Sequence, residues 1–125
     1  MPALGLHHFS IHAPCAELAR IRDFYVEVLG LAEGFRPPFA GFGYWLYTCE
    51  QPVVHLSADE AASTGTDRGA IDHVAFACAD LDGMRSRLDS LGIQYGLSEV
   101  PGQGILQVLL THPLGNGIEL SFSSG

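Results

Sequence analysis

The 125-residue sequence has little positive charge. It contains 6 Lys and Arg residues against 14 Asp and Glu residues, which gives a formal net charge of −8. Proteins that bind nucleic acids do so through clustered lysines and arginines, so this balance argues against a nucleic-acid partner. No apolar run approaches the roughly 18 residues that cross a bilayer, so we expect no membrane partner either.

Cysteine is also scarce, with Cys15, Cys49 and Cys78 forming neither a CxxC pair nor an even set. We expect three free thiols that serve as small core residues in a reducing compartment. The N-terminus lacks the basic, apolar and small-residue order of a signal peptide. The sequence therefore predicts a cytoplasmic location.

A weak internal repeat divides the sequence into two similar halves. The segment "HHFSIHAP" resembles "DHVAFACA" and aligns His8 with His73. Near the end of each half, "PVVHLS" resembles "NGIELS" and aligns His55 with Glu119. The spacing from His8 to His55 differs by one residue from that between His73 and Glu119, so we interpret the chain as two copies of one module.

Each half is predicted to contain a strand, a helix and three further strands, which is an α+β pattern. The expected helices carry apolar residues at steps of three and four and end at a glycine. Their residues are Leu18, Ile21, Tyr25 and Val28 before Gly30, and, after an Asp80 N-cap, Leu81, Met84, Leu88 and Leu91 before Gly92. We predict a first βαβββ module over 1–62, a linker over 63–69 and a second βαβββ module over 70–125.

The strand pattern predicts a metal site, because side chains alternate between the two faces of a strand. His8, His55, His73 and Glu119 fall on the faces opposite the bulky apolar residues of their strands. Imidazole and carboxylate suit zinc, iron, nickel, cobalt or manganese better than magnesium or calcium. We therefore predict one divalent transition metal bound by these residues.

The other histidines of "LHHFSIHA" are expected to be bystanders. His7 is predicted to point with Phe9 and Ile11 toward the helix side. His12 shares a face with His8 but lies about 13 Å away along an extended strand, too far to share one ion. We expect His12 to be a rim residue.

Three residues are candidates for substrate binding. Arg36, between apolar residues and a Pro pair, is suited to a substrate carboxylate but is also typical of an exposed arginine. Trp45, in an aromatic strand, is a candidate for an aryl pocket or for the core. Gln107 interrupts an apolar strand, where it would hydrogen-bond either a substrate or a neighbouring strand.

Four segments resemble the vicinal oxygen chelate superfamily, the group of glyoxalases, bleomycin-resistance proteins and extradiol dioxygenases. They are "LHHFSIHA", "RDFYVEVLGL", "DHVAFACADL" and "HPLGNGIELSF". The resemblance covers essentially the whole chain and implies paired βαβββ modules with curved sheets around a divalent metal, usually in homodimers. It also implies that His8, His73 and Glu119 are metal ligands.

The position of His55 leaves the reaction open. The resemblance implies four protein ligands in glyoxalase-like and epimerase-like members, which have Glu or Gln there, and three in ring-cleaving dioxygenases. His55 is then either a fourth ligand or an acid/base group beside a three-ligand site, and Glu119 could also transfer a proton.

The sequence therefore predicts a metal-dependent enzyme that chelates vicinal oxygens of a small-molecule substrate, either a lyase or isomerase or a ring-cleaving dioxygenase. The alternative is a drug- or metabolite-sequestering protein of the bleomycin-resistance type without catalysis. A thiol transferase of the antibiotic-resistance kind is a third candidate, but the sequence has no clear cluster of Lys and Arg for a phosphonate.

Overall fold

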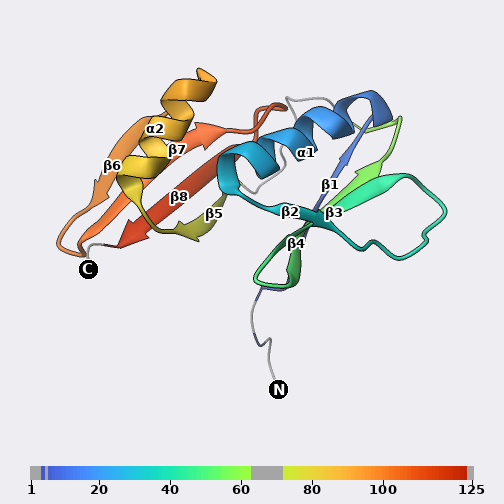
Figure 1. The fold of residues 1–125 in the computed structure, drawn as a ribbon, viewed down its shortest axis with the longest axis horizontal. Coiled ribbons are helices and arrows are strands. Elements are labelled where there is room, and N and C mark those ends of the chain that lie inside the picture. The colour runs from blue at the N-terminus through green and yellow to red at the C-terminus, as the bar shows by residue number, and fades with distance from the viewer. Residues whose placement is uncertain (1–3, 5, 63–71, 124–125) are drawn as a thin grey trace. The chain divides into compact units, whose positions relative to one another are not determined.

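A computed structural model describes residue 4 and residues 6–62 and 72–123 of the chain. The chain divides into two compact units, Met1–Thr64 and Gly65–Gly125. The described residues form two helices and eight strands in two four-stranded sheets (Figure 1), which confirms the predicted α+β fold of two βαβββ modules. The predicted linker, 63–69, lies outside the described residues, so the module limits stay a prediction.

The first unit follows the order strand, helix and three strands. Its elements are β1 (Phe9–Ala13), α1 (Cys15–Leu29), β2 (Ala32–Gly34), β3 (Gly43–Thr48) and β4 (Gln51–Ala58). The sheet has the order β1-β4-β3-β2, in which β1 and β4 are parallel and the other pairs antiparallel. A parallel pair needs a long crossover connection, and here that connection includes α1.

The core of the first unit lies between α1 and one face of its sheet. All four residues of the predicted helical stripe are buried, and α1 contacts both β3 and β4. The strands contribute Leu46, Val54 and Leu56, each fully buried. The helix ends where Gly30 adopts a left-handed conformation (φ 72°) and its N–H donates to the carbonyl oxygen of Val26.

The second unit repeats this topology. Its elements are β5 (His73–Cys78), α2 (Leu81–Leu91), β6 (Gly96–Val100), β7 (Ile105–Thr111) and β8 (Gly117–Ser123). The sheet order is β5-β8-β7-β6, with β5 parallel to β8 and the remaining pairs antiparallel. The two units therefore have the same strand order, as the repeat in the sequence predicts.

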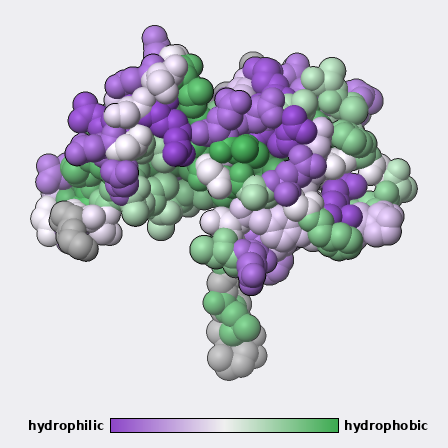
Figure 2. All heavy atoms as spheres, viewed as in Figure 1, coloured by the Kyte–Doolittle hydropathy of each residue, from purple (hydrophilic) through white to green (hydrophobic). Residues whose placement is uncertain are grey.

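Helix α2 begins and ends at the predicted residues. The Asp80 carboxylate accepts a hydrogen bond from the Gly83 N–H at 3.0 Å, and Gly92 caps the other end. Met84 and Leu88 are buried, and mainly hydrophilic side chains lie over α2 in Figure 2. Leu91, the last residue of the helix, is 41% exposed.

The expectation of core cysteines was wrong for two of the three. Cys15 is exposed at the first turn of α1, and Cys49 is exposed in the β3–β4 turn with φ 49°. Cys78 is half-buried, and burial raises the pKa of its thiol. All three thiols are free. No helix of the described residues is long and apolar enough to cross a membrane.

Candidate metal and substrate site

The second unit brings His73 and Glu119 together. The parallel register of β5 and β8 places Ala75 opposite Glu119 and puts His73 and Glu119 on one sheet face. His73 Nε2 lies 3.4 Å from Glu119 Oε1. His73 Nδ1 lies 2.9 Å from Asp72 Oδ2. Because a carboxylate oxygen accepts, we assign the proton of neutral His73 to Nδ1, which leaves the Nε2 lone pair beside Glu119.

The separation of these two atoms suits two ligands of one ion. Ligand bonds of about 2.0–2.2 Å place two adjacent donor atoms roughly 2.8–3.6 Å apart in octahedral or tetrahedral geometry. The distance of 3.4 Å between His73 Nε2 and Glu119 Oε1 agrees with that range. The donor set, imidazole and carboxylate, is one that divalent transition metals prefer. This pair therefore fits the metal that the sequence predicts.

Electrostatics also connect His73 to its neighbours. The hydrogen bond to Asp72 and the nearby charge of Glu119 raise the pKa of His73, although slight desolvation acts the other way. The Glu119 side chain is 15% exposed and that of His73 is 46% exposed. Glu119 is therefore the sheltered member of the pair and His73 the accessible one. The negative charge of Glu119 favours a cation between the two side chains.

Gly117 lets β8 approach β5 closely enough to bring the pair together. A Cβ atom at position 117 would lie 2.9 Å from the Asp72 carbonyl oxygen and 2.9 Å from His73 Cβ. Both distances are shorter than normal van der Waals contacts. A glycine is therefore required opposite His73.

The first unit brings His8 and His55 together on the sheet face opposite its core. Their rings stack with centroids 3.7 Å apart and planes at 11°. On its other side His55 stacks on Trp45, with centroids 4.0 Å apart and planes at 11°. The register explains the second contact, because Trp45 of β3 lies directly opposite His55 of β4.

His55 is the more enclosed of the two histidines. It is 8% exposed, and its Nε2 lies 3.0 Å from the Pro52 carbonyl oxygen. A carbonyl oxygen only accepts, so we assign the proton of neutral His55 to Nε2 and the lone pair to Nδ1. Burial, and then the charge of His8, lower the pKa of His55. Burial therefore favours the neutral form of the ring.

The stack restricts how His8 and His55 can share an ion. The lone pair of an imidazole nitrogen lies in the plane of its ring, and two nearly parallel planes separated by a stack cannot both contain one ion. At 11° and 3.7 Å, both rings cannot point at the same metal without leaving the stack. In this arrangement one of the two histidines can bind an ion, and the other lies beside the bound one.

The prediction for His7 was wrong. His7 is exposed, and its Nδ1 lies 2.9 Å from His8 Nδ1. Strand β1 begins only at Phe9, so the alternation of faces does not extend to His7. His12 is exposed with its Nδ1 3.8 Å from Asp59 Oδ2, in agreement with a rim position.

The predicted substrate residues Arg36 and Trp45 line one pocket of the first unit together with His55. Its volume is about 340 Å³, and its walls include Ser10, Phe39 and Ser57. Gln107 lies in β7 of the second unit, opposite Ser98 and Ser121. It is half-buried and shares a sheet face with Glu119, because Leu109, two residues further along β7, pairs with Glu119.

Sequence reasoning missed the residues that orient the histidines. Asp72 and His7 each directly precede a predicted ligand, and that adjacency was the available signal. Within either unit, the described residues contain no group of three His, Cys, Asp or Glu side chains placed to hold a metal. Each unit supplies two of the four predicted ligands.

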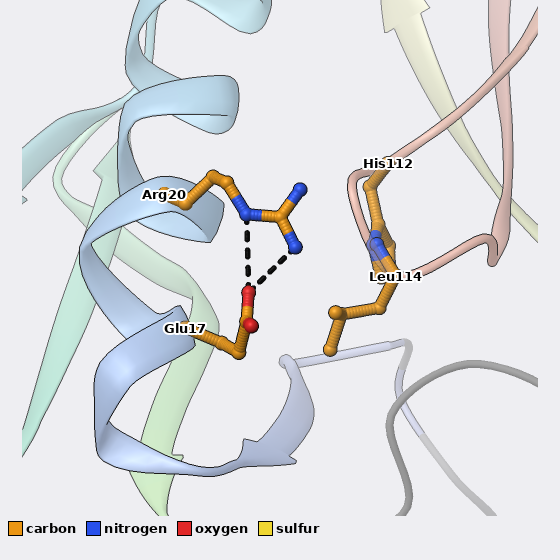
Figure 3. Close-up of polar contacts among 4 residues, drawn as sticks. All are labelled: Glu17, Arg20, His112 and Leu114. Atoms are coloured by element: carbon orange, nitrogen blue, oxygen red, sulfur yellow. Dashed lines mark hydrogen bonds and ion pairs between the residues drawn. The ribbon is translucent and has the colours of Figure 1, made fainter.

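Two polar contacts, made by the residues labelled in Figure 3, belong to the scaffold of their own units. Buried His112 accepts a hydrogen bond at Nδ1 from the Leu114 N–H at 3.0 Å, which organises the loop before β8. In α1, Arg20 pairs with Glu17, with Nε 3.0 Å from Oε2. His112 is therefore a structural histidine, and Arg20 an arginine that already has a carboxylate partner.

Solved structures with the same fold are numerous. A glyoxalase family protein from Bacillus anthracis has a TM-score of 0.80 at 23% identity and covers 99% of this chain and 98% of its own. Lactoylglutathione lyase from Agrobacterium tumefaciens has a TM-score of 0.70 at 22% identity, covering 98% and 96%. A mutant of the fosfomycin resistance protein FosX from Listeria monocytogenes, complexed with Mn(II) and 1S,2S-dihydroxypropylphosphonic acid, has a TM-score of 0.73 at 12% identity, covering 98% and 95%.

A comparison with curated proteins found no match. At identities of 12–23%, the structural likeness establishes the fold alone. The sequence itself matches a family profile over residues 5–120, nearly the whole chain. The chain therefore belongs to the Glyoxalase/Bleomycin resistance protein/Dioxygenase superfamily.

Proposed function

We propose that this protein is a metal-dependent enzyme that binds two neighbouring oxygens of a small-molecule substrate on one divalent transition metal. His8, His73 and Glu119 are the ligands in this proposal, and the metal is iron, zinc, nickel, cobalt or manganese. The observation that carries it is the 3.4 Å approach of His73 Nε2 to Glu119 Oε1, with Asp72 on the other nitrogen of His73.

The metal would supply Lewis acidity to the paired oxygens. The chain's own residues have separate tasks. Asp72 holds the His73 proton on Nδ1, which would leave the lone pair of Nε2 available to a metal ion. Glu119 contributes the negative charge, which with two neutral imidazoles leaves a net positive centre for an anionic oxygen pair.

His55 is proposed as a proton acceptor beside the metal. Its Nε2 is engaged with Pro52, and its ring plane is parallel to that of His8. Its Nδ1 therefore carries the lone pair, and burial keeps the ring neutral. A neutral imidazole with one free nitrogen can take a proton from a bound substrate.

Sequestration without catalysis is the second candidate. It is favoured by the pocket in the first unit, which has an arginine and an aromatic wall of its own. A binding protein would need that pocket but no bound metal, so metal content separates the two.

The test is metal content after anaerobic purification. Wild type is compared with His8→Ala, His55→Ala, Glu119→Gln and, as a matched control, His12→Ala, which removes an exposed histidine from β1. We expect about one metal per chain in wild type, His12→Ala and His55→Ala, and a loss of most of it in His8→Ala and Glu119→Gln.

Two of the following outcomes would change the proposal, and the expected one would narrow its reaction class. Equal loss in His55→Ala and His8→Ala would make His55 a fourth ligand and favour a lyase or isomerase. Retention in His55→Ala would favour a three-ligand site and oxygen chemistry. Sub-stoichiometric metal in wild type under every supplement would leave sequestration as the better account.

A further inference from the structure

The arginine in the pocket of the first unit has an unused hydrogen-bonding edge. Nη1 of Arg36 donates to the Gly41 carbonyl oxygen at 2.9 Å. Its Nε is buried and has no hydrogen-bond partner among the described residues. No carboxylate of the described residues forms an ion pair with it, in contrast to Arg20 and Arg22 of α1.

Such an edge is costly unless a ligand uses it. A buried donor without a partner destabilises the folded chain, and more so when the donor is charged. The Nε and Nη2 groups of a guanidinium point to the same side and form a fork that matches the two oxygens of a carboxylate. The Nε–Nη2 edge of Arg36 is therefore suited to a carboxylate, which would reach the buried Nε only when the guanidinium moves away from Gly43.

Gly43 allows the guanidinium to lie against the sheet. A Cβ atom at position 43 would lie 2.9 Å from both Nε and Nη2 of Arg36 and 2.1 Å from the Leu56 carbonyl oxygen. Any other residue there would displace the backbone or the arginine. The position of the guanidinium is thus set by β3 as well as by the loop between β2 and β3 (Figure 1).

Aromatic rings form the wall between Arg36 and the histidine pair. The Arg36 guanidinium carbon lies 5.1 Å from the centroid of the Phe39 ring, and the centroids of the Phe39 and Trp45 rings are 6.0 Å apart. Trp45 in turn stacks on His55. Phe39 is 55% exposed and Phe42 is 52% exposed, so apolar ring surface is open at this side of the unit. A flat, conjugated ligand suits this wall better than a saturated one.

Volume and charge limit the ligand further. The pocket of about 340 Å³ lies at the small end of ligand sites. At the roughly 30 Å³ that a water occupies in the liquid, it holds about ten non-hydrogen atoms. Arg36 is the one permanently charged side chain among its lining residues, all of which are described, and it balances a single negative charge.

We propose that this pocket selects a planar, conjugated monocarboxylate of about ten non-hydrogen atoms, with the carboxylate on Arg36 and the ring plane along Trp45. This proposal deepens the proposed function, because the opposite end of the ligand would then face His55. As a substrate assignment it also rests on that proposed function. The binding of the carboxylate itself does not need the metal.

The probe is benzoate, which has nine non-hydrogen atoms, and its binding is followed by the intrinsic fluorescence of the protein. Trp45 is the single tryptophan of the chain, so its fluorescence reports this pocket directly. Benzoate should quench it with a dissociation constant in the roughly millimolar range, in metal-loaded and in chelator-treated protein alike. Cyclohexanecarboxylate tests planarity and should bind about 5- to 10-fold more weakly. Benzyl alcohol tests charge and should not bind measurably.

Variants assign the carboxylate to Arg36. Arg36→Met, which keeps the length of the side chain, should weaken benzoate binding by about 10- to 100-fold. Arg36→Lys, which keeps the charge but loses the fork, should fall between Arg36→Met and wild type. The matched control Arg20→Met removes an arginine that pairs with Glu17 and should bind benzoate like wild type. Circular dichroism of each variant confirms that it folds.

The outcomes separate the two proposals. Unchanged benzoate affinity in Arg36→Met, or absence of benzoate binding by wild type, would overturn the pocket assignment whatever the metal content. Equal affinity for benzoate and cyclohexanecarboxylate would overturn the planar ligand. Normal benzoate binding by a protein that takes up no metal would uphold the pocket and reject the enzyme.

Discussion

Asp72 is the residue whose effect on the candidate site is most direct. Its carboxylate lies 2.9 Å from His73 Nδ1, the nitrogen that faces away from Glu119. Removing a partner that orients a histidine ligand costs about 10- to 100-fold in metal affinity. Because the Asp72 side chain is 80% exposed, we expect Asp72→Ala to fall near the lower limit, about 10-fold.

Titration of metal-free protein with zinc, followed by a competing chromophoric chelator, measures this loss. Glu99→Ala is the control, because it removes an exposed carboxylate from β6 of the same sheet. Equal affinities of Asp72→Ala and wild type would show that His73 is not oriented by Asp72.

His55 predicts a pH dependence of folding in the metal-free protein. Burial lowers its pKa in the folded state below the ordinary 6.5. The unfolded chain then takes up the proton first as the pH falls, so the stability contributed by neutral His55 is present above pH 6.5 and is lost as the pH falls through the lower, folded-state pKa. His73, with its raised pKa, acts with the opposite sign.

Comparison with His55→Gln isolates this contribution. We expect the difference in unfolding free energy between wild type and His55→Gln to shift against wild type between about pH 8 and pH 5. Urea denaturation at several pH values measures it. A difference that stays constant with pH would mean that His55 titrates alike in the folded and unfolded chain.

At the residue scale, the faces of the ligands could be predicted and their neighbours could not. Alternation along a strand places His73 and Glu119 on one face, whereas His8 directly precedes β1 and stacks on His55 of β4. The contact between His7 and His8 depends on where β1 begins, which local pattern does not define to one residue.

At the scale of elements, the close approach of β5 and β8 depends on Gly117. In Gly117→Ala, the added Cβ would overlap the Asp72 carbonyl oxygen and His73 Cβ, each at 2.9 Å. We expect a loss of about 1–3 kcal/mol in unfolding free energy, as for other overpacked sites, together with weaker metal binding.

Gly96→Ala is a matched control for this substitution. Gly96 lies in β6 of the same sheet, and a Cβ atom there would meet nothing within 4 Å. Its effect should stay within about 0.5 kcal/mol. Equal effects of the two substitutions in thermal or urea unfolding would contradict the role given to Gly117.

Element limits were predictable where capping chemistry marks them. Both helices end at the expected glycines, and Asp80 caps α2 through its side chain. The stack of Trp45 on His55 was not predictable, because it depends on the pairing of β3 with β4. That pairing contains an irregularity between Leu46 and Tyr47, which shifts the register and which residue patterns do not locate.

For the whole molecule, the repeat in the sequence explains the duplicated topology. Each unit supplies one pair of candidate ligands at equivalent positions, with His8 directly before β1, and the first unit adds a pocket with one arginine. The cytoplasmic location and the homodimer stay predictions. On a chain with a net charge of −8, a single arginine in an aromatic pocket is a specific signal for an anionic ligand.

The central claim is that residues of both repeats bind one metal. The measurement that tests it most directly is the equilibrium metal-to-chain ratio of wild type, His8→Ala and His73→Ala after anaerobic loading with iron, zinc, nickel, cobalt or manganese and removal of free ions. We predict a ratio of about one in wild type for at least one metal, and a ratio near zero for that metal in both folded variants. A wild-type ratio near zero for every metal, or full occupancy in His8→Ala or His73→Ala, would contradict the claim.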